Sequence, residues 1–193
     1  MDVTTLDDLA TRVRACSVCA DVLPMEPRPV FQVSPTARLL VASQAPGSRV
    51  QASGIPFFDD SGERLRDWMG VSSTLFYDAR KIAILPMGFC YPGRREGGDA
   101  PPRRECAQLW RGDLLDLMPA LRLTLLVGTY AQLDALGPGK MVDRVRAFRT
   151  YLPDYFPLPH PSWRSRLWSQ NNPWFEGEVL PALKNEVRRA LAS

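Results

Sequence analysis

Four short apolar runs separated by helical segments constrain the fold of this chain more than any other feature of its sequence. The runs cover residues 38–42, 82–85, 123–127 and 155–158. Runs of this length are typical of strands buried on both faces, because a half-exposed strand would alternate apolar and polar side chains. Helical periodicity fills much of the intervening chain, as in residues 4–14, 62–69, 105–117 and 176–191. The sequence predicts an α/β fold, a three-layer α/β/α sandwich with a short, mostly parallel central sheet of about four strands.

The carboxyl ends of these strands mark where a ligand site is expected. In parallel sheets, ligands bind in the crevice beyond those ends. The segments that follow the strands are residues 43–47, 86–90, 128–129 and 160–162. We therefore expect the residues that carry the chemistry to lie in these segments and in the loops next to them.

Length and composition favour one intracellular globular domain. The chain has 193 residues, of which 45% are hydrophobic and 23% charged, and this length suits a single domain over residues 1–193. The longest apolar stretch, residues 121–127, is interrupted by Arg122 and is too short to span a membrane. The first 15 residues lack the basic start and apolar run of a signal peptide. The sequence thus predicts a cytoplasmic, nucleoid-associated, bacterial-type monomer without membrane contact.

Four cysteines form a close pair and a spaced pair. They are Cys16, Cys19, Cys90 and Cys106. In a cytoplasmic protein disulfides are disfavoured, and C-x-x-C spacing places two thiolates within reach of one metal or cluster. The pattern predicts a four-thiolate site that holds an iron–sulfur cluster or zinc. Two unrelated pairs of buried free thiols are the alternative.

Arginine dominates the basic residues. The chain has 24 basic residues against 21 acidic ones, and only three of the basic residues are lysines. Arginine suits phosphate contact and base stacking better than lysine does, although a GC-rich genome would give the same bias. Arginine alternates with tryptophan over residues 163–168, a pattern that favours contact with phosphates and unpaired bases. A loop with Arg94, Arg95, Arg103 and Arg104 is a second candidate contact, or merely a solvated loop.

An ordered set of motifs carries a family resemblance. Ser43-Gln44-Ala45-Pro46-Gly47 follows the first strand, Gly54-Ile55-Pro56-Phe57 comes next, the four cysteines have the matching spacing, and His160-Pro161-Ser162 follows the last strand. Over nearly the whole chain, this set resembles the uracil-DNA glycosylase superfamily, and most closely its iron–sulfur branch. The resemblance implies a monofunctional hydrolase that removes uracil from DNA and initiates base excision repair.

The resemblance also implies a role for each motif. Phe57 stacks on the base flipped out of the duplex, and His160 hydrogen-bonds the base carbonyl that gains charge as the glycosidic bond breaks. The cluster is structural, with zinc as the alternative occupant. The implied residues are His160 and Gln44 as catalytic groups; Ala45, Phe57 and Pro86 as base-binding groups; Pro46, Gly47, Ser162, Trp163, Arg164 and Arg166 as DNA-binding groups; and Cys16, Cys19, Cys90 and Cys106 as ligands of a 4Fe–4S cluster.

The same residues have structural interpretations. Phe57 can be a core side chain, and His160, the single histidine of the sequence, can be a turn residue stiffened by its two proline neighbours. Asp59 and Asp60 are candidates for positioning water, but are expected to cap the helix that begins near Gly62. Trp174 and Phe175 are expected in the core.

Three positions depart from the family pattern. Pro86 stands where the branch usually carries the Asn that reads the base, Gln44 stands where Glu is usual, and Ala45 stands where other branches carry an Asp that orients water. Two alternatives follow: a glycosylase for hypoxanthine or xanthine, and a catalytically weak iron–sulfur protein that binds DNA.

Overall fold

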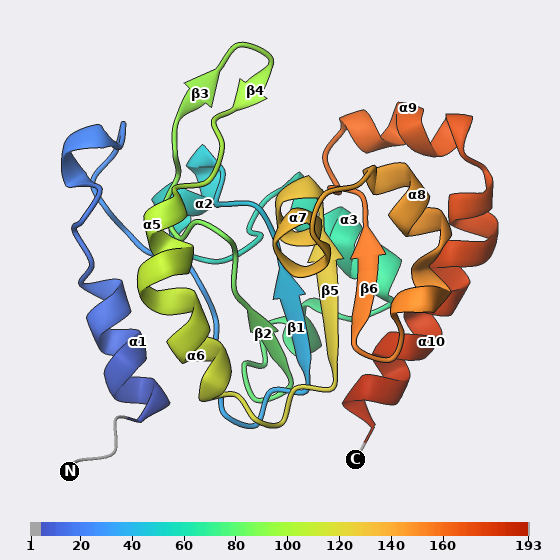
Figure 1. Ribbon diagram of the computed structural model, residues 1–193, viewed down its shortest axis with the longest axis horizontal. Coiled ribbons are helices and arrows are strands. Elements are labelled where there is room, and N and C mark those ends of the chain that lie inside the picture. Colours follow the sequence, from blue (N-terminus) through green and yellow to red (C-terminus); the bar gives the residue numbers. More distant parts are fainter. Residues whose placement is uncertain (1–4, 193) are drawn as a thin grey trace.

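Four parallel strands form the centre of the structure, a computed structural model that describes residues 5–192. The strands are β1 (Leu39–Ala42), β2 (Ile82–Ile84), β5 (Leu123–Val127) and β6 (Tyr155–Leu158). They lie in the order β2-β1-β5-β6, and each neighbouring pair is parallel (Figure 1). The four predicted strands are confirmed, with bounds that agree to within one residue.

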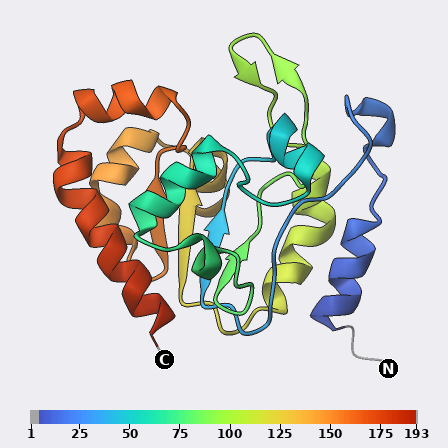
Figure 2. The same ribbon diagram turned by 180° about the vertical axis from the view of Figure 1, so that it is seen from behind.

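Helices cover both faces of this sheet. They are α1 (Leu6–Arg14), α3 (Asp60–Met69), α7 (Thr129–Leu136), α8 (Met141–Arg146), α10 (Leu180–Leu191), and a composite helix made of α5 (Arg104–Cys106), a π turn (Ala107–Arg111) and α6 (Gly112–Asp116). Figure 2, which views the molecule from behind, brings α3 in front of the strands that α7 partly covers in Figure 1. Within residues 5–192, none of the helices has the length and apolar character needed to cross a membrane.

The side chains of β1 show why both faces need a cover. Leu39 and Val41 belong to the core on the face where α3, α8 and α10 pack. Leu40 belongs to the core on the opposite face, with side chains of α1 and α6, and Ala42 packs against α7. Successive strand residues point to opposite faces, so a strand that is apolar throughout must be buried on both. The three-layer α/β/α architecture predicted from the sequence is therefore confirmed.

The first helix forms as its capping signal predicts. The Thr5 hydroxyl accepts a hydrogen bond from the backbone N–H of Asp8 at 3.2 Å, and the Asp8 carboxylate accepts one from the Thr5 N–H at 3.3 Å. This capping box satisfies two backbone donors that the first turn leaves unpaired. Thr4, the first residue of the predicted helix, lies outside the described residues. The helix ends at Arg14 and leads directly into Cys16 and Cys19.

Short elements occupy segments for which the sequence predicts no helix or strand. Two loops contain α2 (Ser48–Ser53) and the hairpin of β3 (Arg94–Arg95) and β4 (Gly98–Asp99), and unassigned segments contain α4 (Ser73–Phe76) and α9 (Arg164–Asn171). The hairpin pairs Arg94 with Asp99 and Arg95 with Gly98, and its glycines at 97 and 98 have positive φ. Elements this short carry no hydrophobic period, so the spacing of apolar residues does not predict them. The hairpin extends beyond the carboxyl edge of the sheet (Figure 1).

Candidate active site

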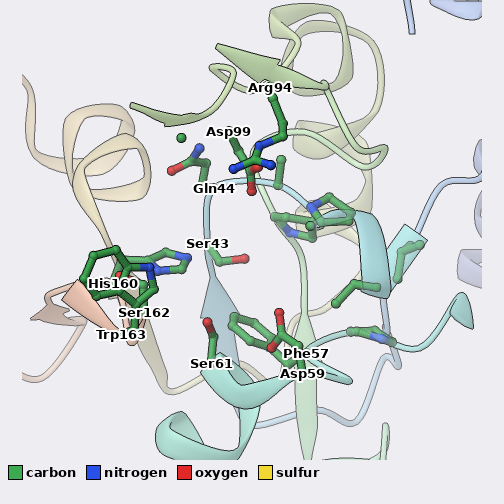
Figure 3. Close-up of a pocket in the computed structure, with 18 of the residues that line it drawn as sticks. Ser43, Gln44, Phe57, Asp59, Ser61, Arg94, Asp99, His160, Ser162 and Trp163 are labelled. Carbon is green, nitrogen blue, oxygen red and sulfur yellow. The ribbon is translucent and has the colours of Figure 1, made fainter. Parts of the chain in front are cut away.

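A cavity of about 560 Å³ lies at the carboxyl edge of the sheet. Its walls come from the segments that follow β1, β2 and β6 and from the β3–β4 hairpin. Figure 3 shows Ser43, Phe57 and His160 arranged around its centre. Parallel strands deliver their carboxyl ends to one edge, and this brings together residues that are far apart in the chain.

Most residues singled out from the sequence line this cavity. Those that do are Gln44, Ala45, Pro46, Gly47, Phe57, Pro86, His160, Ser162 and Trp163. Arg166 is exposed and is not part of the lining, and the side chain of Arg164 lies outside what the structure describes. The motif residues therefore share one site. Arg166 of α9 does not contribute to its walls.

Several lining residues were not predicted to belong to the site. They include Val30, Ser43, Val50, Ser61, Ile84, Glu96 and Asp99. Ser43 and Ser61 stand inside the quoted motifs or beside them, so their positions in the sequence indicate the site. Glu96 and Asp99 have no such signal, because two-residue strands leave no periodic pattern. Arg94, a candidate phosphate contact, also lines the cavity.

Phe57 is held in an unusual backbone conformation. Its φ is +54°, a region that side chains with a Cβ rarely adopt. The Phe57 carbonyl accepts hydrogen bonds from the Tyr77 hydroxyl at 3.3 Å and from Arg66 at 3.4 Å. The ring packs edge-on against Phe76, with 6.1 Å between centroids. Strain of this kind persists where the surroundings fix it, so Phe57 presents a fixed aromatic face to the cavity.

Gly62 makes the Phe57 conformation possible. A Cβ on Gly62 would lie 1.8 Å from the Phe57 carbonyl oxygen. The Gly62 N–H donates at 2.9 Å to the Asp59 carboxylate, which thereby caps α3. The predicted capping role of Asp59 is confirmed, and the same side chain also lines the cavity. Asp60 instead forms a surface ion pair with Arg49 at 3.0 Å.

His160 lies in a partly desolvated position, where two carboxylates act on it electrostatically. Burial lowers the pKa of its imidazole below the usual 6.5, while the negative charges of Asp59 and Asp99 act in the opposite direction. Removing a cationic ring from water disfavours its charged form. The ring is therefore neutral at neutral pH and offers an N–H to a ligand.

The loop after His160 is fastened to α3. Arg64 donates to the Ser162 carbonyl and, at 3.1 Å, to the Ser165 hydroxyl. The Ser165 hydroxyl donates in turn to the Ser162 carbonyl at 2.6 Å. Trp163, next in the chain, is 74% exposed at the cavity rim. Trp174 and Phe175 pack against Trp168; Phe175 lies in the core as expected, whereas Trp174 is partly buried and packs against the core.

The four cysteines border a second, much smaller cavity of about 20 Å³. All four are free thiols. The Phe89 N–H donates to the sulfur of Cys106 at 3.4 Å, and the backbone of Arg28 donates to Cys90. Burial raises the pKa of Cys90 and of Cys106 to about 11.

These residues fit a four-thiolate group in residue type, because four cysteines from three separate segments border one small cavity and two of them receive backbone N–H donors. Hydrogen bonds to sulfur are a usual feature of iron–sulfur sites. In the described part of the chain, no three or more His, Cys, Asp or Glu side chains are gathered closely enough to hold a single metal ion.

Comparison with known proteins gives a family match over most of the chain. A family model, that of the uracil DNA glycosylase superfamily, matches residues 30–184. This span includes every residue that lines the larger cavity. Among solved structures, the chain is similar to the solution NMR structure of a candidate uracil DNA glycosylase from Methanosarcina acetivorans, with 15% identity and a TM-score of 0.42 over 82% of this chain and 98% of that one. The family assignment rests on the family model.

Gly62→Ala is expected to destabilise the protein by about 1–3 kcal/mol, because the added methyl group overlaps the Phe57 carbonyl and must displace the loop. Urea unfolding measures the change. Gly112→Ala is the matched control: a Cβ at Gly112 meets nothing within 4 Å, and alanine there should be neutral or stabilise the helix by up to about 1 kcal/mol. Equal unfolding midpoints for Gly62→Ala and the wild type would contradict this account of Phe57.

The single histidine permits a direct test of its environment. NMR titration should show a pKa below 6.5 for His160, because burial disfavours the imidazolium. In the unfolded chain the ring takes up a proton near pH 6.5, so the stability that the neutral ring contributes above that pH is lost as the pH falls toward the folded-state pKa. Asp59→Asn and Asp99→Asn should each lower the pKa further. A pKa above 6.5 for His160 in the folded protein would contradict the conclusion that burial keeps its ring neutral.

Proposed function

Because the chain belongs to the uracil DNA glycosylase superfamily, we propose that it is a monofunctional DNA glycosylase that hydrolyses the N-glycosidic bond of uracil in DNA and so begins base excision repair. One observation carries the proposal: Phe57, His160 and the loop at residues 43–47 line one cavity at the carboxyl edge of the sheet. An aromatic face, a neutral N–H donor and closely approaching backbone are what an extruded base needs.

The cavity residues suggest how the reaction proceeds. The base leaves the duplex and stacks on Phe57, whose position the Tyr77 and Arg66 hydrogen bonds fix. The His160 N–H then donates to the base carbonyl that becomes negative as the bond to the sugar breaks. A donor aligned in advance stabilises this charge without reorganisation, which is worth about 3–4 kcal/mol of the barrier. The neutral state of His160 suits this role, because a neutral ring donates without attracting a counter-ion of its own.

Exposed residues beside the cavity supply the DNA contacts in this proposal. Trp163 stands at the rim, and Leu167, one helical turn further along α9, is 65% exposed. Such side chains can fill the space that a flipped nucleotide leaves in the duplex. Ser162, Arg164 and Arg166 follow the same segment and would contact phosphates. We further propose that the protein acts as a cytoplasmic, nucleoid-associated monomer.

The cysteine site is proposed to hold a structural 4Fe–4S cluster, with zinc as the alternative. Cys16, Cys19, Cys90 and Cys106 would bind it, and it supplies cross-linking rather than reaction chemistry. Cys16 and Cys19 follow α1, whereas Cys90 and Cys106 flank the segment that contains the β3–β4 hairpin. A bound group would therefore join the first helix to the base of the hairpin that lines the active cavity.

Pro86 favours a second candidate substrate. It is buried and lines the cavity, it stands where the family pattern carries the Asn that reads the base, and it has no side-chain donor or acceptor. A cavity of about 560 Å³ has room for a purine. Hypoxanthine and xanthine are therefore the alternative substrates, and a weak iron–sulfur DNA-binding protein is the alternative without efficient chemistry.

The proposal is tested by base release from oligonucleotides that contain uracil, hypoxanthine or xanthine, followed by alkaline cleavage. We expect excision of uracil, and His160→Ala should slow it by about 10²–10³-fold with little change in DNA affinity, as for loss of one preorganised donor. Leu133→Ala, at an exposed position on α7 away from the cavity, is the control and should keep wild-type rates. Tight DNA binding without release of any of the three bases would support the binding-protein alternative.

The cluster has a spectroscopic test. Protein purified without oxygen should absorb broadly at about 400 nm and contain about four irons per chain. Cys90→Ser should lose the absorbance and lower the unfolding midpoint, because metal binding contributes to folding. Ser17→Ala, between Cys16 and Cys19, leaves the four sulfurs in place and should retain the iron. A colourless protein with one zinc per chain would replace the cluster with the zinc alternative.

A further inference from the structure

The cavity contains acidic side chains that the motifs do not account for. The carboxylates in its lining are Asp59, Glu96 and Asp99. Gln44 and Ala45, the motif positions at which related branches carry an acid, have none. Any carboxylate that acts on the reacting sugar must therefore come from another element of this chain.

Asp99 is distinguished from the other two by its surroundings. The Asp59 carboxylate is engaged in capping α3, at 2.9 Å from the Gly62 nitrogen. Glu96 lies at the turn of the hairpin, whereas Asp99 lies on β4 and acts electrostatically on His160. No described residue donates a hydrogen bond to the exposed Asp99 carboxylate or forms an ion pair with it. The Asp99 carboxylate is thus available to a ligand, and it lines the same cavity as the His160 imidazole.

The hairpin holds Asp99 over the first motif. The amide nitrogen of Gln44 lies 3.5 Å from the carbonyl oxygen of Ala100, the residue next to Asp99. The Ala100 N–H donates to the Gly93 carbonyl at 2.8 Å, which closes the base of the hairpin. A Cβ built on Gly47 would stand 3.9 Å from an oxygen of the Asp99 carboxylate. Figure 3 shows Asp99 next to Gln44 at the cavity rim.

Arg94 faces Asp99 across the hairpin. The two residues are directly paired in the β3–β4 register, so their side chains lie on the same face, and both line the cavity. A cation beside the carboxylate lessens its repulsion of the DNA phosphates. The hairpin can therefore bring a negative charge close to a polyanionic substrate.

We propose that Asp99 is a catalytic carboxylate of this enzyme, which stabilises the cationic sugar and orients the attacking water from the side of the cavity that the β3–β4 hairpin forms. This inference rests on the proposed glycosylase function. Gln44 is a positioning residue in it, because its contact with Ala100 ties the first motif to the strand that carries Asp99. The carboxylate absent from the motif is in this way replaced by one from a separate segment.

The reaction balances as a hydrolysis. The bond between the sugar C1′ and the base nitrogen breaks, and its electron pair leaves with the base, whose carbonyl His160 hydrogen-bonds. The oxygen of water forms the new bond to C1′. One proton of that water passes to the Asp99 carboxylate and then to solvent, and the base anion takes a proton from solvent. The products are an abasic site and a free base.

Two abasic DNA duplexes separate this role from base recognition. One carries a neutral tetrahydrofuran in place of the sugar, and the other a pyrrolidine that is protonated and mimics the cationic sugar. The wild type should bind the cationic duplex at least about tenfold more tightly, because a carboxylate close to a cation attracts it. Asp99→Asn should remove this preference and leave affinity for the neutral duplex unchanged.

Two matched variants serve as controls. Asp60→Asn makes the same change in a carboxylate that is paired with Arg49 at the surface, and should keep the preference. Asp59→Asn retains a capping side chain and tests the competing carboxylate. Equal affinity of the wild type for the two duplexes overturns the proposal. So does a preference that disappears in Asp59→Asn and persists in Asp99→Asn.

Single-turnover base release completes the experiment. Asp99→Asn should slow release by about 10²–10³-fold, with an unchanged dissociation constant for the neutral duplex. The wild type could prefer the cationic duplex in an Asp99-dependent way and yet release no base. That result would refute the proposed glycosylase function and leave the position of Asp99 in the cavity intact. Base release at the wild-type rate by Asp99→Asn would overturn the inference and leave the glycosylase function standing.

Discussion

Burial of the central sheet on both faces is the constraint on which the rest of the structure depends. Leu39, Leu40 and Val41 of β1 are each at most 2% exposed, although they point to alternate faces. A strand buried in this way needs helices on both sides, and parallel neighbours must be joined through crossover connections. The carboxyl ends of the strands then meet at one edge, and the loops that build the cavity all begin there.

At that edge, stability and function make opposite demands on the backbone. Phe57 adopts a left-handed conformation, which costs about 1–3 kcal/mol. The hydrogen bonds to its carbonyl and the space left by Gly62 keep it there. Burial of the large apolar core beneath the cavity offsets this cost in folding free energy. The aromatic face is thereby fixed in the free protein, so the base binding proposed here would not need to order it.

One segment borders both cavities. Cys90, Arg103 and Cys106 line the cysteine cavity, and the hairpin between them contributes Arg94 and Asp99 to the larger one. A group bound to the four cysteines, as proposed, would also hold the base of the hairpin. The position of Asp99 over the first motif would then depend on the cysteines, as well as on the contact between Gln44 and Ala100.

The sequence by itself determined the four strands, the main helices, the capping of α1 and the motif residues that share the larger cavity, because burial leaves a hydrophobic period and caps have a local signature. Only the tertiary structure decided the rest. The hairpin is too short to carry a period, and α9 lacks a capping side chain. Asp99 and His160, which line the same cavity, come from a hairpin and from the segment that follows β6. Such proximity is set by the parallel sheet, which brings distant segments to one edge, and no local pattern of residues records it.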